Sequence, residues 1–390
     1  MEMEKRCVVF TFNYPPRIGG ESLVTYKLLN SSAYSFDVMS STFSKTAVSD
    51  LATRSDIRVY NTTAGAGWVF FSLRQFHRGK KQYDCMMSRS MPVLSHVPAL
   101  IVKFFHPRLK WIASISDPIY NTPYRTLQTL RSRLTAKIED HIEKKVYRKA
   151  DQLVFTNEYM MKYILQGKYE KYREKANVIG FGYDPSIRPK ENAAIGELVQ
   201  QAHGERHAKM IAHVGAMYGD RNADIMIEGY KQYLAEKRPD EIPVEVLFLG
   251  ASKKNLTAAI EKAGLEAYMH VISTVPYEES LYCMRRVDAL FLIDLEFEHI
   301  KPSIFLPSKV YDYVYAQKPI MIFGSNEGPV SDLLAGTGAQ RFSYTVDGVK
   351  DCLAQFSETA VEPEYQDIQK FSVTASSDKL DRIITKLRTN

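Results

Sequence analysis

The segment from Leu306 to Ile320 holds the residues best suited to binding a phosphate group. Pro307 and Ser308 are typical of a helix start, with Ser308 as the N-cap. Lys309 and Asp312 then lie three residues apart, on one face of the predicted helix. A helix N-terminus carries partial positive charge and free N–H groups, so it can hold an anion, and Lys309 would add a full charge. Asp312 could accept hydrogen bonds from sugar hydroxyls. The alternative is an ordinary surface helix with a Lys–Asp pair.

Two adjacent glycines near the N-terminus mark a second candidate region. The apolar run Cys7–Phe12 predicts a buried strand, and a loop with two prolines and two glycines follows it. From Glu21 to Leu29 the spacing is helical, so Gly19 and Gly20 would let a ligand approach the backbone at a helix N-terminus. The G-x-G-x-x-G pattern of dinucleotide sites is absent, and a nicotinamide cofactor is not indicated. A tight turn without a ligand is the alternative.

Two further charged residues follow predicted strands. Asp117 comes just after the strand 110–115, at the end where open α/β sheets bind their ligands, although Asp-Pro is also a common turn pair. Arg221 lies before a helix expected from Ala223, with Asn222 as its N-cap. There a guanidinium and free N–H groups could share an anion.

Strands and helices alternate along the chain in two consecutive series. This pattern predicts an α/β fold with two Rossmann-like domains, whose parallel sheets are covered on both faces and face one another across a cleft. The length of 390 residues also favours two cores over one. We expect the first domain at 1–190 and the second at 191–370, with 185–207 as a turn-rich linker. The last helix, in 371–390, is expected to pack back towards the first domain.

The composition is that of a globular protein, with 45% apolar and 25% charged residues. The four cysteines are scattered without a C-x-x-C pair, which predicts reduced thiols and no structural zinc. The N-terminus lacks a signal-peptide pattern, and no apolar run approaches the roughly 18 residues of a membrane span. We therefore expect a cytoplasmic protein.

One region, 125–149, is markedly basic. Residues 101–150 contain eleven Lys and Arg against four Asp and Glu. Three interpretations are a solvated helix packed on a domain, a peripheral contact with anionic lipid at the inner face of a membrane, and a nucleic-acid site. Nucleic acid is not predicted, because no recognition motif accompanies the charge. Apolar residues three or four apart form one stripe on this helix: Leu127, Leu130, Leu134, Ile138, Ile142 and Val146.

Taken in order, these segments resemble the GT-B glycosyltransferases of family 4, also called glycosyl transferases group 1, over nearly the whole chain. The resemblance rests on the order and spacing of short motifs rather than on any one of them. The segments that carry it are 14–20, 110–112 with 116–118, 150–151 with 155–158, 213–215 with 218–221, 289–294, and 306–313 with 318–320.

The resemblance implies an enzyme of the hexosyltransferase type. It would bind a nucleotide-diphosphate-sugar donor mostly through the second domain and hold the acceptor on the first. Transfer would proceed with retention at the anomeric carbon, with no essential metal and no cofactor besides the donor itself. The implied acceptor is a glycan or a lipid-linked glycan intermediate of polysaccharide biosynthesis.

The same resemblance assigns roles to individual residues. Gly19 and Gly20 would touch the diphosphate region of the donor, and Arg221 would hold the pyrophosphate. The helix start at Ser308 and Lys309 would face the phosphates. The implied donor-binding set is Gly19, Gly20, Gly215, Arg221, Ser308, Lys309 and Asp312, and the implied catalytic set is Asp117, Arg221 and Lys309.

The chain departs from the family pattern at one position. Asp312 matches the second acidic residue of the family's Glu-x7-Glu motif, which holds the ribose, but the first acidic position is Ile304. The first Glu normally grips hydroxyls of the donor sugar, so the identity of that sugar stays open. Glu296 and Glu298 could substitute from a loop, or form a solvated turn. Asp117 falls where relatives place a His or Asp near the reacting centre, which implies an acceptor-orienting or proton-accepting carboxylate.

Two other functions fit the same architecture. A sugar-nucleotide epimerase of GT-B architecture would need acid–base carboxylates around one sugar and no acceptor. A catalytically degenerate protein would bind a ligand or partner without turnover, and the apolar Ile304 is consistent with it.

Overall fold

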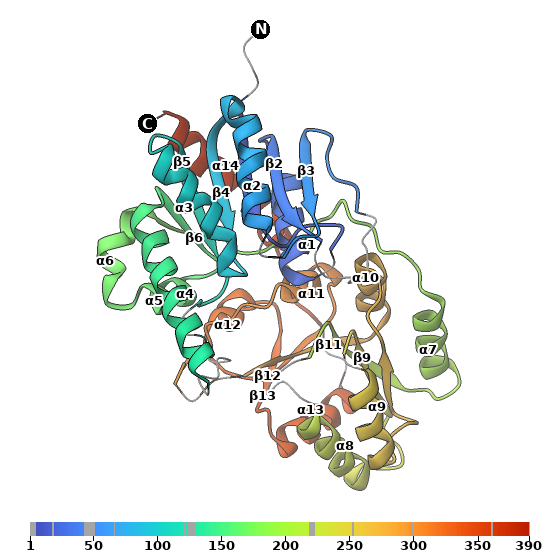
Figure 1. The fold of residues 1–390 in the computed structure, drawn as a ribbon. Helices are drawn as coiled ribbons and strands as arrows, with labels where there is room; N and C mark the ends of the chain where they lie inside the picture. The colour runs from blue at the N-terminus through green and yellow to red at the C-terminus, as the bar shows by residue number, and fades with distance from the viewer. Residues whose placement is uncertain are drawn as a thin grey trace. The chain divides into compact units, whose positions relative to one another are not determined.

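The computed structural model describes residues 5–17, 19–42, 51–65, 67–119, 122, 129–217, 223–251, 253–295, 297, 299–359 and 362–389. The chain forms two compact units, the first made of Met1–Asp184 with Phe371–Asn390 and the second of Pro185–Lys370. Each unit is a parallel sheet with helices on its faces (Figure 1). The prediction of two Rossmann-like domains with parallel sheets is confirmed.

The first unit is built on a seven-stranded parallel sheet in the order β3-β2-β1-β4-β5-β6-β7. Chain order reverses between β1 and β4, and such a reversal is the usual ligand-binding position of an open α/β sheet. At that position Thr11, the last residue of β1, pairs with Arg89, the last residue of β4. The strands are β1 (Arg6–Thr11), β2 (Phe36–Ser41), β3 (Ile57–Thr62), β4 (Tyr83–Arg89), β5 (Lys110–Ile115), β6 (Gln152–Phe155) and β7 (Ala176–Val178).

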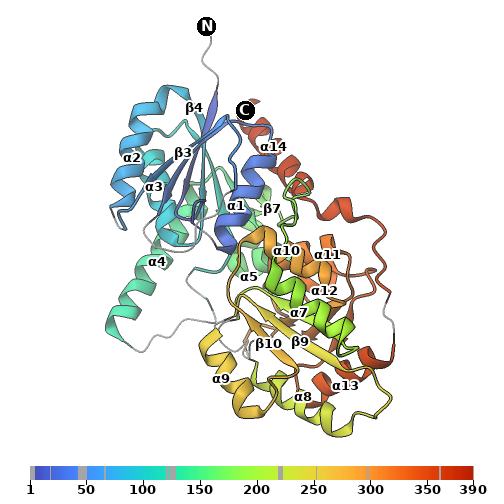
Figure 2. The same cartoon turned by 90° about the vertical axis from the view of Figure 1, so that its right-hand side faces the viewer.

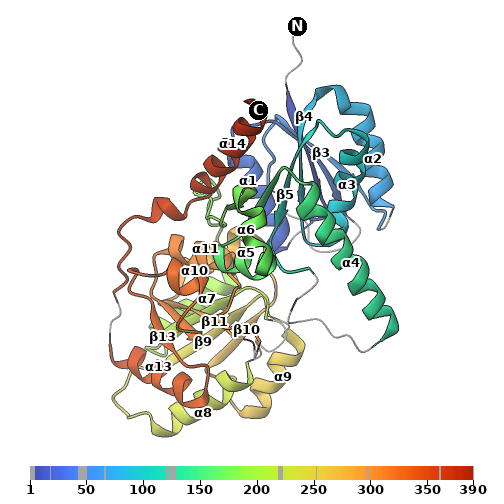
Figure 3. The same cartoon turned by 90° about the vertical axis from the view of Figure 1, so that its left-hand side faces the viewer.

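Helices cover both faces of this sheet. Helices α1 and α14 lie on one face, and α2 and α3 lie on the other, where Phe10, Met86 and Trp111 form part of the buried core (Figure 2). Helix α4 continues past the other elements of the unit at its N-terminal end (Figure 3). The helices are α1 (Gly20–Ser31), α2 (Trp68–Gly79), α3 (His96–Phe105), α4 (Leu130–Lys149), α5 (Glu158–Leu165), α6 (Tyr169–Tyr172) and α14 (Val373–Thr389).

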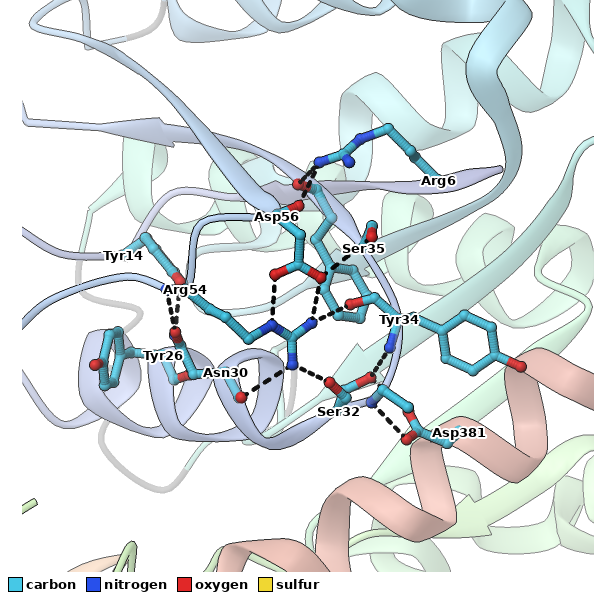
Figure 4. Close-up of polar contacts among 12 residues, drawn as sticks. Arg6, Tyr14, Tyr26, Asn30, Ser32, Tyr34, Ser35, Arg54, Asp56 and Asp381 are labelled. Carbon is cyan, nitrogen blue, oxygen red and sulfur yellow. Dashed lines mark hydrogen bonds and ion pairs between the residues drawn. The ribbon is translucent and has the colours of Figure 1, made fainter. Parts of the chain in front are cut away.

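The C-terminal helix α14 is fixed to the first unit by polar contacts at the end of α1 (Figure 4). The Asp381 carboxylate accepts hydrogen bonds from the Ser32 hydroxyl at 2.5 Å and from the Ala33 backbone N–H at 2.8 Å. Arg388 forms an ion pair with Asp84 at 2.7 Å. Chain segments from opposite ends of the sequence therefore complete one unit.

The second unit has a six-stranded parallel sheet in the order β10-β9-β8-β11-β12-β13, with its reversal between β8 and β11. Its strands are β8 (Lys209–Val214), β9 (Val244–Leu249), β10 (Met269–Ile272), β11 (Ala289–Asp294), β12 (Ile320–Gly324) and β13 (Gln340–Phe342). Its helices are α7 (Ala193–Gly204), α8 (Asp224–Glu236), α9 (Lys253–Ala263), α10 (Tyr277–Arg286), α11 (Lys309–Ala316), α12 (Pro329–Leu333) and α13 (Val346–Glu358). The apolar side chains of α8 and α13 pack on the sheet in one buried core.

Two local expectations need correction. The stretch 185–207, expected as a linker, contains helix α7, which Asn192 caps and which buries Ile195 and Val199. The sequence predicts a strand over 83–87 and a connection to the next helix through Ser88 and Arg89, but strand β4 continues to Arg89. Within the described ranges, no helix combines the length and apolar character needed to cross a membrane.

Candidate functional site

The reversal of strand order in the second unit brings two predicted site residues, Gly215 and Lys309, to one edge of its sheet, together with Asp294, which was not predicted. Gly215 directly follows β8, Asp294 ends β11, and Lys309 is the first residue of α11. All three lie at the carboxyl end of the strands, where parallel sheets bind their ligands. The fold therefore brings Gly215 and Lys309 together, as the prediction of a shared donor site requires.

Lys309 is held by a specific contact. Its Nζ donates a hydrogen bond to Nε2 of His213, at 3.1 Å, and the His213 ring is buried. Gly215 makes room for this lysine, since a Cβ atom at residue 215 would lie 2.9 Å from Lys309 Nζ. Gly215 also has a φ of +116°, a conformation that favours glycine. His213 belongs to a motif of the sequence, but its contact with Lys309 was not predicted.

The start of helix α11 differs from the expected capped N-terminus. Ser308 has helical backbone angles, with φ −60° and ψ −28°, and its side chain makes no capping hydrogen bond. The prediction of Ser308 as a side-chain N-cap is therefore wrong. The N–H groups of Val310 and Tyr311 donate to the carbonyls of Pro307 and Ser308, at 3.1 and 3.2 Å. These two groups are thus engaged, so the attraction for an anion rests mainly on the charge of Lys309.

Asp312 lies one turn further along α11 and is almost fully buried. Its Oδ1 accepts a hydrogen bond from the hydroxyl of Tyr277, at 2.7 Å, so the carboxylate is held in a fixed orientation. Tyr277 is the first residue of α10. Sequence reasoning did not single out this tyrosine, because nothing in the local pattern distinguishes it from other aromatic residues at helix starts.

Ile304, which stands where the family pattern has its first acidic residue, lies in the interior of the second unit. Ile304 is 4% exposed, within a buried run from Ser303 to Leu306. In the same region the Ser303 hydroxyl donates to Asp294 Oδ1, at 3.1 Å. An apolar residue therefore fits the environment of position 304 in this chain.

Three residues of the predicted site lie outside the described residues. Arg221, assigned to the pyrophosphate, falls in the interval 218–222. Glu296 and Glu298, considered as substitutes for the missing acidic residue, are also outside the described ranges. Their roles stay predictions.

The first unit places its predicted residues at the carboxyl edge of the sheet. Gly19 and Gly20 stand at the N-terminus of α1, and apart from its chain neighbours no described residue has an atom within 4 Å of the place where a Cβ of Gly19 would be. A ligand would therefore have room beside this backbone. Asp117 follows β5 and is half-buried, next to the buried Ser116.

Two charged residues at this edge were missed by the sequence reasoning. Arg89 ends β4 and is 4% exposed, and its Nε lies 3.6 Å from the Glu21 carboxylate in the first turn of α1. Burial raises the pKa of the Glu21 carboxyl above its ordinary value, while Arg89 and the Ser116 hydroxyl act in the opposite direction. The sequence could have indicated Arg89, because a charged residue at the end of an apolar strand is unusual unless it has a partner.

The described residues contain no candidate metal site. No group of three or more His, Cys, Asp or Glu side chains there is arranged to hold a metal ion.

Comparison with known proteins gives a match at the level of structure alone. No family model matches the chain, and no curated protein matches its sequence. Anabaena HepE, in a complex with UDP-glucose, is similar over 97% of this chain and 99% of its own, with a TM-score of 0.65 and 14% identity. Sucrose-phosphate synthase from Thermosynechococcus elongatus is similar over 98% and 99%, with a TM-score of 0.68 and 12% identity.

A third similar structure is WaaG, a glycosyltransferase involved in lipopolysaccharide biosynthesis. The similarity covers 96% of this chain and 95% of WaaG, with a TM-score of 0.61 and 13% identity. At such low identity these similarities establish the fold and leave the chemistry to be argued from the site. The fold of this chain is that of the GT-B glycosyltransferases.

Proposed function

We propose that this chain is a glycosyltransferase that moves a sugar from a nucleoside-diphosphate-sugar donor to a glycan or lipid-linked glycan acceptor. The observation that carries the proposal is the position of Lys309 at the switch point of the second sheet, against His213 and Gly215. Breaking the sugar–phosphate bond leaves negative charge on the nucleoside diphosphate, and a fixed ammonium group stabilises that charge. The similarity to HepE, whose structure holds UDP-glucose, supports this class of donor.

In this proposal the second unit binds the donor. Lys309 and Arg221 take up the charge of the departing diphosphate, Gly215 and Ser308 lie along the phosphates, and Asp312 accepts hydrogen bonds from the ribose. Because these fixed cations supply the positive charge that the leaving group needs, activity is expected to survive EDTA. Loss of activity in EDTA, restored by a divalent cation, would contradict this part of the proposal.

The first unit is proposed to bind the acceptor. In the same unit, the backbone of Gly19 and Gly20 at the N-terminus of α1 is proposed to touch the diphosphate region of the donor, and Asp117 orients the acceptor hydroxyl. Retention at the anomeric carbon follows from the resemblance to family 4. Nuclear magnetic resonance of the product would give its anomeric configuration, and an inverted product would remove the family 4 assignment.

Helix α4 supports a peripheral contact with an anionic membrane, which would place the protein at the inner face of the membrane. Its apolar stripe divides into two parts. Val146 is fully buried against the first unit, whereas Leu130, Leu134 and Ile138 are 84%, 62% and 53% exposed. Exposed apolar side chains at a spacing of four, surrounded by the basic residues of the helix, are typical of an interfacial helix.

Vesicle binding tests the membrane contact. Wild-type protein is expected to sediment with vesicles that contain anionic lipid and not with zwitterionic vesicles. Leu134→Gln with Ile138→Gln is expected to abolish sedimentation, because it removes the apolar contact and keeps every basic residue. Unchanged sedimentation would contradict the proposal. Reversing Lys144, Lys145, Arg148 and Lys149 serves as the complementary test of the charge contribution.

The donor class can be tested directly with a panel of nucleotide sugars that includes UDP-glucose. A ligand at 100 times its dissociation constant adds about 2.7 kcal/mol to stability, which a thermal-shift measurement resolves. The sugars that bind are then supplied with glycan and lipid-linked acceptors, and transfer is followed by mass spectrometry. Binding followed by transfer is the expected result, and the absence of both would overturn the proposal.

Two alternatives are separated by the same experiment. The structural similarities do not favour the sugar-nucleotide epimerase, which would convert the donor to its epimer without an acceptor. A degenerate binding protein would bind the nucleotide and show no turnover with any acceptor.

A further inference from the structure

The buried guanidinium of Arg89 in the first unit has fewer partners than its position demands. It donates one hydrogen bond, from Nη1 to the Ser114 hydroxyl at 3.0 Å, and its Nε lies 3.6 Å from Glu21. Its Nη2 is buried and has no hydrogen-bond partner among the described residues. A buried arginine with unsatisfied donors is costly, and apolar residues of similar size would serve packing better. Packing therefore does not explain Arg89, and we ask which side chain Arg89 positions.

Glu21 is the residue that Arg89 holds. It belongs to the first turn of α1, next to Gly19 and Gly20, and its side chain is 25% exposed. The exposed part is accessible to a ligand, while Oε2 is buried and accepts no hydrogen bond in the structure. Ser116, whose hydroxyl acts on the pKa of Glu21, directly precedes Asp117, so Glu21 shares the carboxyl edge with the predicted acceptor residue. A carboxylate whose orientation is fixed by an ion pair with a buried arginine is preorganised to contact a ligand.

We propose that Glu21 accepts a hydrogen bond from a hydroxyl group of the acceptor, and that Arg89 is the positioning residue that orients it. This inference rests on the proposed function and names the chemistry of the acceptor at that point: a neutral, hydroxyl-bearing sugar ring. A phosphate group in direct contact with the Glu21 carboxylate would be repelled, so Glu21 is not proposed to contact the diphosphate of the donor.

A purely structural ion pair between α1 and β4 is the competing explanation. It predicts that variants of Glu21 lower stability and affect donor and acceptor kinetics alike. Contact with the acceptor predicts instead a separation of the two Michaelis constants, because only the acceptor loses an interaction.

The test uses steady-state transfer kinetics of the full chain with Glu21→Gln and Glu21→Ala. We expect Glu21→Gln to raise the acceptor KM roughly tenfold and to leave the donor KM unchanged, because a neutral amide is a weaker acceptor than a carboxylate. Glu21→Ala should have a larger effect on the same parameter. Arg89→Lys should shift the acceptor KM less than Glu21→Ala does. Glu158→Gln is the matched control, since Glu158 also lies in the first turn of a helix of this unit, and it should behave as wild type.

Acceptor analogues that each lack one hydroxyl sharpen the test and remain informative if a variant is poorly folded. Wild type should lose affinity for one analogue in particular, and Glu21→Gln should no longer distinguish that analogue from the full acceptor. Equal discrimination by both proteins, or equal changes in donor and acceptor KM, would overturn the proposal. If wild type transfers no sugar from any donor to any acceptor, the proposed function fails and this inference fails with it. Normal transfer by an unaffected Glu21 variant would overturn this inference alone.

Discussion

Charged side chains at the two edges of the first sheet differ in how completely they are hydrogen-bonded. At the amino edge, Asp37 accepts hydrogen bonds from Arg6 at 2.7 Å, Arg58 at 2.8 Å and Tyr83 at 2.8 Å. Nearby, the Arg54 guanidinium pairs with both oxygens of Asp56, at 2.5 and 2.9 Å, and donates to carbonyls at the end of α1 (Figure 4). The Arg6 side chain donates three hydrogen bonds to described residues and that of Arg54 donates five.

At the carboxyl edge, counted over the described residues, Arg89 has one hydrogen bond of 3.0 Å and one ion contact of 3.6 Å, and Glu21 has a buried oxygen that accepts no hydrogen bond. The same side-chain chemistry thus serves stability at one edge and leaves capacity for a ligand at the other. The difference predicts that substitutions at the amino edge change unfolding free energy, and that substitutions at the carboxyl edge change activity.

The largest expected effect on stability is that of Asp37→Ala. The substitution leaves the buried Arg6 guanidinium without its carboxylate, and breaking a buried pair in this way costs about 3–5 kcal/mol. Urea unfolding followed by circular dichroism measures the loss. Asp240→Ala, at a carboxylate that is 82% exposed, should change stability by less than about 0.5 kcal/mol. If Asp37→Ala lowered the free energy of unfolding no more than the control does, the proposed contrast between the two edges would be wrong.

A smaller loss is expected for Asp381→Ala. The Ser32 hydroxyl and the Ala33 N–H lose their acceptor, but this site is partly exposed and water can replace it, so we expect about 1–2 kcal/mol. Differential scanning calorimetry would show the lower melting temperature. Asp378→Ala, at an exposed position of the same helix, is the control. Equal melting temperatures would mean that α14 is held by apolar packing alone.

Replacing both partners at the carboxyl edge should change stability least. The double variant Arg89→Met with Glu21→Gln removes a poorly satisfied buried pair, and such replacements are often neutral or stabilising. We expect the free energy of unfolding to stay within about 1 kcal/mol of wild type, in either direction, while transfer to the acceptor is impaired. A stability loss comparable to that of Asp37→Ala would show that the two edges do not differ.

The pH dependence of Glu21→Gln gives the finest test. Because the pKa of Glu21 is raised in the folded state, the folded protein binds this proton more tightly than the unfolded chain does. Wild type therefore loses stability as pH rises from about 4.3 through the raised folded value, and Glu21→Gln removes that loss. Denaturation at a series of pH values should show the variant gaining stability over wild type as pH rises. A difference that stays constant or falls would contradict the burial of this carboxyl.

The sequence predicted the parts of the fold that depend on local pattern. Alternating apolar strands and amphipathic helices predicted the parallel sheets, and Pro307 with Ser308 predicted a helix whose first residue is Lys309. The apolar run Ile320–Phe323 after Pro319 predicts a short buried strand, and it forms the buried strand β12.

Features that depend on contacts between distant residues were missed. The pairing of Glu21 with Arg89 and that of Tyr277 with Asp312 join separate elements, and no local spacing reveals them. Helix α7 was taken for a linker because Pro185 and Pro189 precede it and its own polar residues obscure the apolar positions that it buries. Ser308 was expected to cap a helix whose first N–H groups instead bond to nearby carbonyls.

The central claim is that Lys309 stabilises the diphosphate of a sugar nucleotide. Transfer kinetics of Lys309→Ala test this claim most directly. The control is Lys231→Ala, which removes one positive charge from the exposed face of α8. The account predicts that Lys309→Ala lowers kcat/KM by a factor of about 100 to 1,000, equivalent to roughly 2.7–4 kcal/mol of transition-state stabilisation, while Lys231→Ala matches wild type. Full activity in Lys309→Ala would contradict it.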